Sequence, residues 1–357
     1  MAPIMIMAGG TGGHIFPALA VAKHLQANGS EVFWLGSPQG LETRLVPTHG
    51  FKLETIDVVG LRSTGLVRKL VAPIQVTAAV VQAMRIIRRY RPQAALGMGG
   101  FASGPGGLAA WLLRVPLIIH EQNTIPGITN RILARLATQV FTAFPNTFPT
   151  AHTCGNPVRA EIAALPPPAT RWQTRTGQLR LLVLGGSQGA KALNDIVPAA
   201  LKLIPANIRP QVRHQTGTAT LEATATGYKQ HDVAAEIVSF IDNMAEAYGW
   251  ADLVVARAGA LTLSELAAAG LGALLVPFPH AVDDHQTHNA AWLVQAGAAK
   301  LLPQQTLTAE NLAACILPFA ENRMRALELA EAARNQAQIA ATQTIAQACI
   351  NLGRNRG

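Results

Sequence analysis

The amino-acid sequence predicts an α/β protein with two doubly wound domains, each built on a parallel sheet. The chain has 357 residues, which is long for a single hydrophobic core. Hydrophobic residues make up 49% and charged residues 14%, a balance that suits parallel sheets covered by helices on both faces. One pattern of apolar run, glycine-rich turn and helix also occurs twice, at the start of the chain and near its middle.

The two openings have the same order of elements. Residues 3–8 are apolar, residues 9–13 read GGTGG, and a helical pattern runs over residues 16–26. In the second half, residues 179–184 (LRLLVL) are apolar except for Arg180 and lead into GGSQGA at 185–190, before another helical pattern. Each opening predicts a strand, a turn and a helix, so we expect two Rossmann-like domains.

The remaining apolar runs predict the other strands and a domain boundary. Strands are expected at residues 31–35, 94–98, 117–120 and 140–144, and in the second half at 211–214, 236–240, 253–256 and 273–277. The linker is expected near residues 155–158, before the prolines at 166–168. The expected domains are therefore residues 1–157 and 158–335.

Basic charge is concentrated in the first domain. Residues 1–157 hold 13 Lys and Arg against 5 Asp and Glu, a net charge of +8, whereas residues 158–357 hold 16 against 15, a net charge of +1. Residues 61–91 contain seven basic residues and no acidic one, around an uncharged and largely apolar stretch at 70–84. That stretch is too short to span a bilayer but could insert shallowly among anionic lipid headgroups. A buried core helix with solvated basic ends is the alternative.

Several classes of protein are disfavoured. The three cysteines, Cys154, Cys315 and Cys349, form no CxxC pair, so neither a disulfide framework nor a zinc site is indicated. The sequence shows neither a signal peptide nor an apolar stretch that could span a membrane, so we expect a cytoplasmic enzyme. A nucleic-acid-binding protein is disfavoured because Tyr90 alone interleaves with the basic residues of the 61–91 segment.

The glycine-rich turn at residues 9–13 is a candidate site for a phosphate or a sugar oxygen. Glycine permits close approach of a ligand, and a helix N-terminus offers free N–H groups. The turn lacks the third glycine of the dinucleotide fingerprint and the Gly-Lys-Ser/Thr of a P-loop, which argues against an NAD-dependent oxidoreductase. His14 ends the turn, where the helix dipole favours the neutral imidazole of a general base. A structural turn with a packing histidine is the alternative.

Polar residues follow other predicted strands. Residues 120–123 (HEQN) stand at the carboxyl end of a strand, where open α/β sheets bind ligands. A helix from about Ala260 would present N–H groups to a phosphate, and Glu265 within it could accept both ribose hydroxyls. The alternatives are an ordinary polar loop and a solvent-exposed glutamate. Residues 280–289 (HAVDDHQTHN) match no usual metal-ligand spacing, so we expect a polar loop facing a sugar, with neither a metal nor a cofactor.

Seven motifs, in their order and spacing, carry a resemblance to a known family. They are GGTGGHIFPALAVA, GMGGFASGPGGLAAW, HEQN, GNPVR, GGSQGA, ALTLSELAAAG and VPFPHA…HQTHNA. Over nearly its whole length the chain resembles the MurG family, the N-acetylglucosaminyltransferases of peptidoglycan synthesis. The resemblance implies a GT-B fold, in which two Rossmann-like domains face a cleft and a C-terminal helix, about residues 336–357, joins the first domain. Phe101 departs from the tyrosine that the resemblance implies there.

The resemblance also implies roles for residues that would bind the donor. Ser187, in the turn at 185–189, faces the UDP diphosphate, Ile241 holds the uracil through its backbone, and Glu265 binds the ribose. Backbone that meets the phosphate and sugar comes from Ala260, Leu261, Thr262, Leu263 and Ser264. Gln286 and Asn123 contact the N-acetylglucosamine, and Arg159 contacts the nucleotide sugar.

On the acceptor side, Thr11, Gly12, Gly13 and His14 would receive a diphosphate. The implied reaction is an inverting transfer of N-acetylglucosamine from UDP-N-acetylglucosamine to undecaprenyl-pyrophosphoryl-N-acetylmuramyl-pentapeptide, at the cytoplasmic face of the bacterial inner membrane. His14 is the first candidate for the catalytic base and Glu121 the second, while helix N-termini stabilise the leaving diphosphate without a metal. The alternative is another GT-B enzyme, either a glycolipid glycosyltransferase or a UDP-N-acetylglucosamine epimerase.

Overall fold

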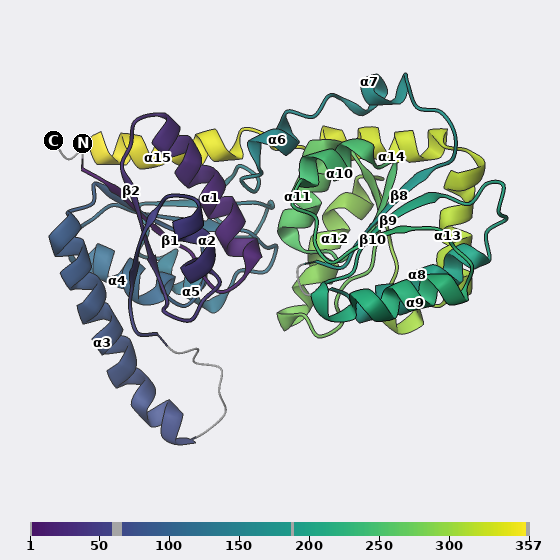
Figure 1. Cartoon of the computed structure of the whole chain (residues 1–357). Helices are drawn as coiled ribbons and strands as arrows, with labels where there is room; N and C mark the ends of the chain where they lie inside the picture. Colours follow the sequence, from purple (N-terminus) through teal and green to yellow (C-terminus); the bar gives the residue numbers. More distant parts are fainter. Residues whose placement is uncertain (1, 59–65, 187–188, 355–357) are drawn as a thin grey trace. The chain divides into compact units, whose positions relative to one another are not determined.

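The computed structural model describes residues 2–58, 66–186 and 189–354, and it divides the chain into two compact units (Figure 1). Of residues 66–72, 282 and 354 only the backbone is described. Unit 1 comprises Met1–Arg159 and Ile339–Gly357, and unit 2 comprises Ala160–Gln338. These bounds lie within three residues of the boundaries expected from the sequence.

Unit 1 is built on a seven-stranded sheet in the order β3-β2-β1-β4-β5-β6-β7, in which every neighbouring pair is parallel. Its strands are β1 (Ile4–Met7), β2 (Val32–Gly36), β3 (Lys52–Thr55), β4 (Ala94–Gly97), β5 (Leu117–Glu121), β6 (Gln139–Thr142) and β7 (His152–Thr153). Its helices are α1 (Gly12–Ala27), α2 (Glu42–Thr48), α3 (Leu66–Tyr90), α4 (Ser103–Leu112), α5 (Ile128–Leu133) and α15 (Ala341–Arg354).

The alternation of side chains along β1 gives unit 1 a core on each face of its sheet. Ile4 and Ile6 join the core that contains apolar residues of α1 and α15. Met5 and Met7 join the opposite core, with apolar residues of α3 and α4. Because both faces are covered, the strand is apolar throughout, as is usual for a parallel sheet. The C-terminal helix α15 packs against α1 and β4, so the end of the chain completes the first unit.

Unit 2 is built on a six-stranded sheet in the order β10-β9-β8-β11-β12-β13, again with all pairs parallel. Its strands are β8 (Arg180–Leu184), β9 (Gln211–Gln215), β10 (Glu236–Val238), β11 (Leu253–Ala256), β12 (Gly272–Leu275) and β13 (Ala299–Leu301). Its α-helices are α6 (Ala160–Ala163), α7 (Pro168–Trp172), α8 (Lys191–Lys202), α9 (Leu221–Gln230), α10 (Met244–Trp250), α11 (Ala260–Ala269), α12 (His285–Gln295), α13 (Ala309–Glu321) and α14 (Met324–Asn335). In the described part of this unit, 3₁₀ turns span Thr218–Thr220, Val282–Asp284 and Gln304–Thr306.

The expectation of two parallel-sheet domains is confirmed, with three differences in detail. The first helix begins at Gly12 and not at Phe16, because two glycines form its first turn. The edge strands β3, β7 and β13 were not expected, since each is short and carries few buried side chains. The expected C-terminal helix begins at Ala341 and not near residue 336, because α14 ends at Asn335 and a turn follows.

Candidate active site

The glycine-rich turn of unit 1 follows β1 at the carboxyl end of the sheet. Gly10 has a φ of +86°, a conformation that glycine adopts without strain. Thr11 and Gly13 are exposed and Gly12 is half-buried. Gly12 and Gly13 form the first turn of α1, where backbone N–H groups precede the first intrahelical hydrogen bonds. The turn therefore presents N–H donors at a helix N-terminus, a geometry suited to an anion.

His14 is oriented by a backbone carbonyl. Its Nδ1 lies 3.1 Å from the carbonyl oxygen of Gly9, and its ring is half-buried. Since a carbonyl oxygen only accepts hydrogen bonds, Nδ1 must carry the proton in this contact. A neutral imidazole then has its lone pair on Nε2, which is the form that a general base requires.

Glu121, the second candidate base, is a buried residue whose two carboxylate oxygens both accept hydrogen bonds. One carboxylate oxygen accepts hydrogen bonds from the backbone and side-chain nitrogens of Asn123, at 3.0 and 3.3 Å. The other accepts from the N–H of Gly127 at 3.2 Å and the Nδ2 of Asn130 at 2.9 Å. With both oxygens engaged, Glu121 holds the loop that carries Asn123, and His14 stays the first candidate base.

The HEQN motif is mostly a buried scaffold. The Nε2 of His120 donates to the Gly155 carbonyl at 2.9 Å, and its Nδ1 lies 3.2 Å from the Nε2 of Gln122. Burial lowers the pKa of His120 to about 4, although the Gly155 carbonyl opposes this shift. Asn123 is half-buried, whereas the other three residues of the motif are fully buried. The motif therefore offers a ligand little more than Asn123.

Arg159 lies beside the first helix. Its guanidinium stands over the ring of Phe16, 5.9 Å from the centroid. Phe16 in turn packs closely on Gly12, where a Cβ would lie 3.0 Å from the ring. Arg159 is thus placed next to the helix that begins with the glycine-rich turn, with its side chain half-buried.

The glycine-rich turn of unit 2 follows β8 in the same way. Ser187 lies outside the described residues. Gly189 has a φ of +79°, and a Cβ there would overlap the backbone oxygen of Thr216. Behind the turn, Asn194 donates to that oxygen at 3.0 Å and to the hydroxyl of Thr220 at 2.8 Å. Backbone therefore packs directly on backbone at Gly189.

Glu265 lies inside α11 and is 4% exposed, so its interpretation as a solvent-exposed residue is wrong. The buried Tyr248 donates its hydroxyl hydrogen to Glu265 Oε2 at 3.1 Å. The helix begins at Ala260, close to the position expected from the sequence, after an extended Gly259. Residues Ala260, Leu261, Thr262, Leu263 and Ser264 form its first turns, whose N–H groups can meet a phosphate.

Ile241 and Gln286 lie in loops or first turns of unit 2. Ile241 is half-buried between β10 and α10. Gln286, in the first turn of α12, accepts a hydrogen bond from the N–H of Phe278 at 2.9 Å. Across the described parts of the chain, no three His, Cys, Asp or Glu side chains are grouped as metal ligands would be.

Two buried residues of the candidate site, Glu42 and Tyr248, are not predicted by any sequence pattern. Glu42 heads α2 and is completely buried, and Tyr248 stands seventeen positions before its partner Glu265. Neither belongs to a recognisable motif, because each contacts its partner only in the folded unit. A glutamate and a tyrosine in otherwise ordinary helical patterns are the only signals that the sequence offers.

Comparisons with known proteins agree with this architecture. Residues 4–142 match the model of the glycosyltransferase family 28 N-terminal domain, and residues 180–347 match that of the family's C-terminal domain. A protein of Nitrosococcus oceani, named UDP-N-acetylglucosamine–N-acetylmuramyl-(pentapeptide) pyrophosphoryl-undecaprenol N-acetylglucosamine transferase, is 53% identical over 98% of each chain. A protein of the same name from Xylella fastidiosa is 52% identical over 97% of this chain and 94% of its own.

Solved structures show the same fold. The crystal structure of Acinetobacter baumannii MurG is similar with a TM-score of 0.85 and 43% identity, covering 98% of this chain and 100% of that one. A UDP-GlcNAc 2-epimerase from Neisseria meningitidis has a TM-score of 0.66 at 12% identity, covering 98% of this chain and all of its own. At that identity the second likeness concerns the fold alone.

Proposed function

Because this chain belongs to glycosyltransferase family 28, and within it to the MurG transferases, we propose that it transfers N-acetylglucosamine from UDP-N-acetylglucosamine to a lipid-linked N-acetylmuramyl-pentapeptide. The observation that carries the proposal is the identity of 53% over 98% of both chains with a transferase of that name. The epimerase alternative has a likeness of fold only, at 12% identity.

Unit 2 holds the donor in this proposal. The N-terminus of α11 receives the diphosphate of UDP, since its free N–H groups and helix dipole favour negative charge. Glu265 accepts the ribose hydroxyls, and its hydrogen bond from Tyr248 keeps the carboxylate in place. The backbone at Ile241 holds the uracil, and Gln286 contacts the sugar. Ser187, outside the described residues, would face the diphosphate as well.

Unit 1 holds the acceptor. The N–H groups of Gly12 and Gly13, together with the exposed Thr11 hydroxyl, receive the acceptor's diphosphate. We assign Asn123 and Arg159, also in this unit, to the N-acetylglucosamine and the nucleotide sugar.

The reaction follows from these assignments. Nε2 of His14 takes the proton of the acceptor hydroxyl while the hydroxyl oxygen attacks the anomeric carbon of the donor sugar. The bond from that carbon to the UDP oxygen breaks on the opposite face, so the configuration inverts, and the N–H groups of α11 stabilise the charge that develops on the diphosphate.

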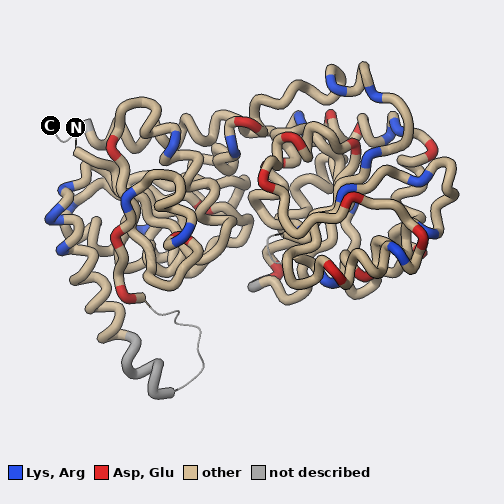
Figure 2. The backbone as a smooth tube through the Cα atoms, in the orientation of Figure 1, with Lys and Arg blue, Asp and Glu red and all other residues tan. Residues whose placement is uncertain are grey.

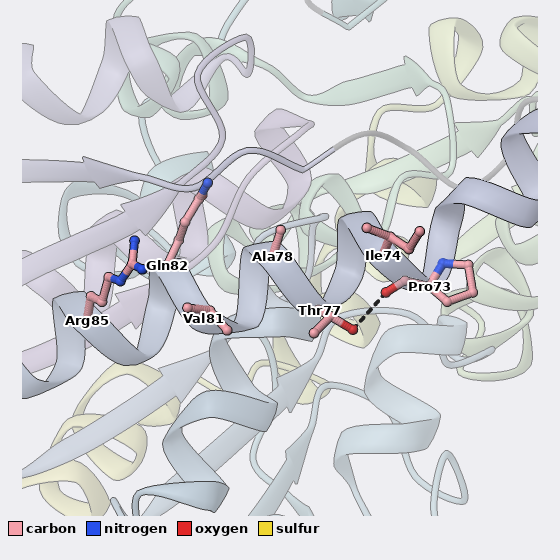
Figure 3. Close-up of a pocket in the computed structure, with 7 residues that line it drawn as sticks. All are labelled: Pro73, Ile74, Thr77, Ala78, Val81, Gln82 and Arg85. Atoms are coloured by element: carbon pink, nitrogen blue, oxygen red, sulfur yellow. Dashed lines mark hydrogen bonds between the residues drawn. The ribbon is translucent and has the colours of Figure 1, made fainter.

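The acceptor's lipid anchor makes the surface of α3 relevant. Within the described parts of the chain, none of the helices combines the length and the apolar composition that a membrane span requires. Ile74 is 69% exposed and Val81 41% exposed, and both line a shallow apolar depression that ends at Arg85 (Figure 3). Trp111, at the end of the neighbouring α4, is 47% exposed. Alanine and valine residues on the other side of α3 are buried in the core, so the core interpretation holds for one face only.

Basic residues adjoin this apolar face. Arg85, Arg88 and Arg89 are exposed on the second half of α3, where Figure 2 shows a group of basic residues. The side chains of Arg68 and Lys69 are outside the described part. Exposed apolar side chains beside arginines suit an anionic lipid surface, and we propose that unit 1 docks there, on the cytoplasmic face of the inner membrane.

Transfer of a radiolabelled sugar tests the function. Wild-type protein given UDP-N-acetylglucosamine and lipid-linked muramyl-pentapeptide should form a lipid-linked disaccharide.

Glu265→Ala should weaken UDP binding by about 2 kcal/mol or more, measured by calorimetry, because charge-assisted hydrogen bonds are lost. His14→Ala should lower kcat while UDP affinity stays near that of the wild type.

Two matched variants serve as controls. Glu222→Ala removes an exposed glutamate from α9, and His24→Ala removes the other histidine of α1. Both should behave like the wild type.

Release of an epimerised UDP-sugar without transfer would favour the epimerase alternative and contradict the proposal.

Co-sedimentation with vesicles tests the membrane surface. Anionic vesicles should bind the protein, and high salt should weaken binding because exposed charges are screened. Arg85→Gln with Arg88→Gln should weaken binding roughly tenfold or more, since each basic residue contributes about 1 kcal/mol. Lys191→Gln with Lys229→Gln removes the same charge from exposed sites of unit 2 and should change nothing. Equal loss in both pairs would show that net charge, and not α3, is responsible.

A further inference from the structure

One peptide group of unit 1 is held at both ends by functional side chains. The N–H of Gly10 donates to Glu42 Oε2 at 3.0 Å. The carbonyl of the same peptide group, that of Gly9, accepts from Nδ1 of His14 at 3.1 Å. A buried carboxylate and the candidate base therefore meet across a single amide plane.

Glu42 is built into this position. It is completely buried, and its second oxygen accepts from the N–H of Ser37 at 3.0 Å and from the Ser37 hydroxyl at 2.7 Å. Three glycines make room for it: a Cβ at Gly9 would lie 2.5 Å from its Oε1, one at Gly36 would lie 2.8 Å from its Cγ, and one at Gly40 would overlap its carboxylate. A buried carboxylate must be satisfied by donors, and here one of those donors belongs to the glycine-rich turn.

The peptide group has no freedom to turn away. The N–H of Gly9 donates to the carbonyl of Gly99 at 3.3 Å. A Cβ at Gly100 would lie 2.5 Å from the Gly9 oxygen, and one at Gly99 would lie 2.9 Å from Nε2 of His14. The second glycine-rich segment of unit 1 thus packs on both the peptide and the imidazole.

We propose that Glu42 is a positioning residue that acts on His14 through the peptide group between Gly9 and Gly10. A carboxylate that accepts the N–H polarises the amide, and the carbonyl becomes a stronger acceptor for Nδ1–H. The opposite tautomer would set the Nδ1 lone pair against the carbonyl oxygen, so the proton stays on Nδ1 and Nε2 keeps its lone pair. This inference rests on the proposed function in one respect, that His14 is the base.

The tautomer of His14 gives a readout that is independent of activity. In protein labelled with ¹⁵N-histidine at pH 8, the His14 signals, identified by their loss in His14→Gln, should show a protonated Nδ1 and an unprotonated Nε2. In Glu42→Gln the Gly10 N–H faces either the NH₂ group or a neutral amide oxygen, so the peptide group is less polarised and the two tautomers should mix. A wild-type protein with the proton on Nε2 would overturn the proposal, even if Glu42→Gln failed to fold.

Kinetics then separate positioning from a general structural effect. Glu42→Gln should lower kcat about tenfold or more, while the affinity for UDP, bound by unit 2, stays within about twofold of the wild type. In a His14→Ala background the same substitution should lower kcat no further, because two residues that act as one unit are not additive. Glu31→Gln, at an exposed glutamate before β2, is the matched control and should leave kcat unchanged.

An equal loss of kcat in the presence and absence of His14 would mean that Glu42 acts by holding the fold, and would overturn the proposal. Loss of UDP binding in Glu42→Gln would do the same. If the wild type forms no lipid-linked disaccharide, the proposed function fails, but the tautomer measurement still decides whether Glu42 orients His14.

Discussion

The two glycine-rich turns occupy equivalent places, because β1 and β8 each lie within a parallel sheet, between a pair of neighbouring strands, and lead into a helix. They are held from behind in different ways. A buried carboxylate, Glu42, accepts an N–H of the first turn. Neutral groups support the second, where Asn194 donates to the Thr216 oxygen against which Gly189 packs.

The difference shows that one sequence pattern can be supported by charge or by shape. In unit 1 the space around Gly10 is open, and the turn depends on a hydrogen bond to a carboxylate. In unit 2 the turn depends on the absence of a side chain at Gly189. Substitutions at Gly10 and at Gly189 should therefore have unequal effects.

Gly189→Ala should have the largest effect. The new Cβ would overlap a backbone oxygen in a residue with φ of +79°, so backbone must move, at a cost of about 3 kcal/mol of stability. Thermal unfolding and UDP titration should both show the damage. Gly186→Ala is the matched variant, because its φ of +78° is similar and nothing lies within 4 Å of its Cβ. Equal losses of stability in the two variants would mean that the left-handed backbone, and not the overlap with the Thr216 oxygen, causes the damage.

Acid should weaken the neutral support of unit 2. His214 bridges the Tyr228 hydroxyl, 2.9 Å from its Nδ1, and the Asn194 side-chain oxygen, 3.1 Å from its Nε2. Burial lowers the pKa of His214 to about 3, against 6.5 when it is solvated. Below pH 6.5 the unfolded chain binds a proton that the folded unit does not, so stability falls as the pH falls, by about 1 kcal/mol per pH unit down to the folded pKa.

Urea unfolding of wild type and His214→Gln at pH 7 and pH 5 tests this sign. Glutamine can donate to Asn194 and accept from Tyr228 without titrating, so its variant should lose less stability between the two pH values. His152→Gln, at an exposed histidine of unit 1, is the comparison and should lose as much stability between the two pH values as the wild type. If His214→Gln loses as much stability between pH 7 and pH 5 as the wild type, His214 is excluded as the source of the pH dependence.

Gly10→Ala should have the smallest effect of the three on stability. Its φ is +86°, but nothing lies within 4 Å of a Cβ, so the cost is the left-handed backbone alone, about 1–2 kcal/mol. Gly13→Ala, in the first turn of α1 and with a neighbour no closer than 3.6 Å, should be neutral or slightly stabilising. Differential scanning calorimetry would compare the two, and a loss at Gly10 as large as that at Gly189 would contradict the contrast between the turns.

Much of the architecture follows from local patterns. The apolar runs that became β1, β8 and β11 are continuous because both faces of each sheet are covered, so neighbouring residues along the chain already carry the signal. The same holds for the start of α11, where Ala260 follows a strand and a glycine. The edge strand β3 escaped prediction because its pairing with β2, and not its own composition, makes it a strand.

Local sequence encodes the two domains, the two glycine-rich turns, His14 and the helix that carries Glu265, since each is formed by residues that are near neighbours in the chain. The side chains that support these features can be identified only in the folded units. The HEQN motif contains Glu121, but it does not show that both oxygens of this residue accept hydrogen bonds in the fold. Glu42 has no signal in the sequence, because it meets Gly10 across thirty-two positions. A hydrogen bond between distant residues depends on how strands are ordered in the sheet, and that order arises from packing the whole unit.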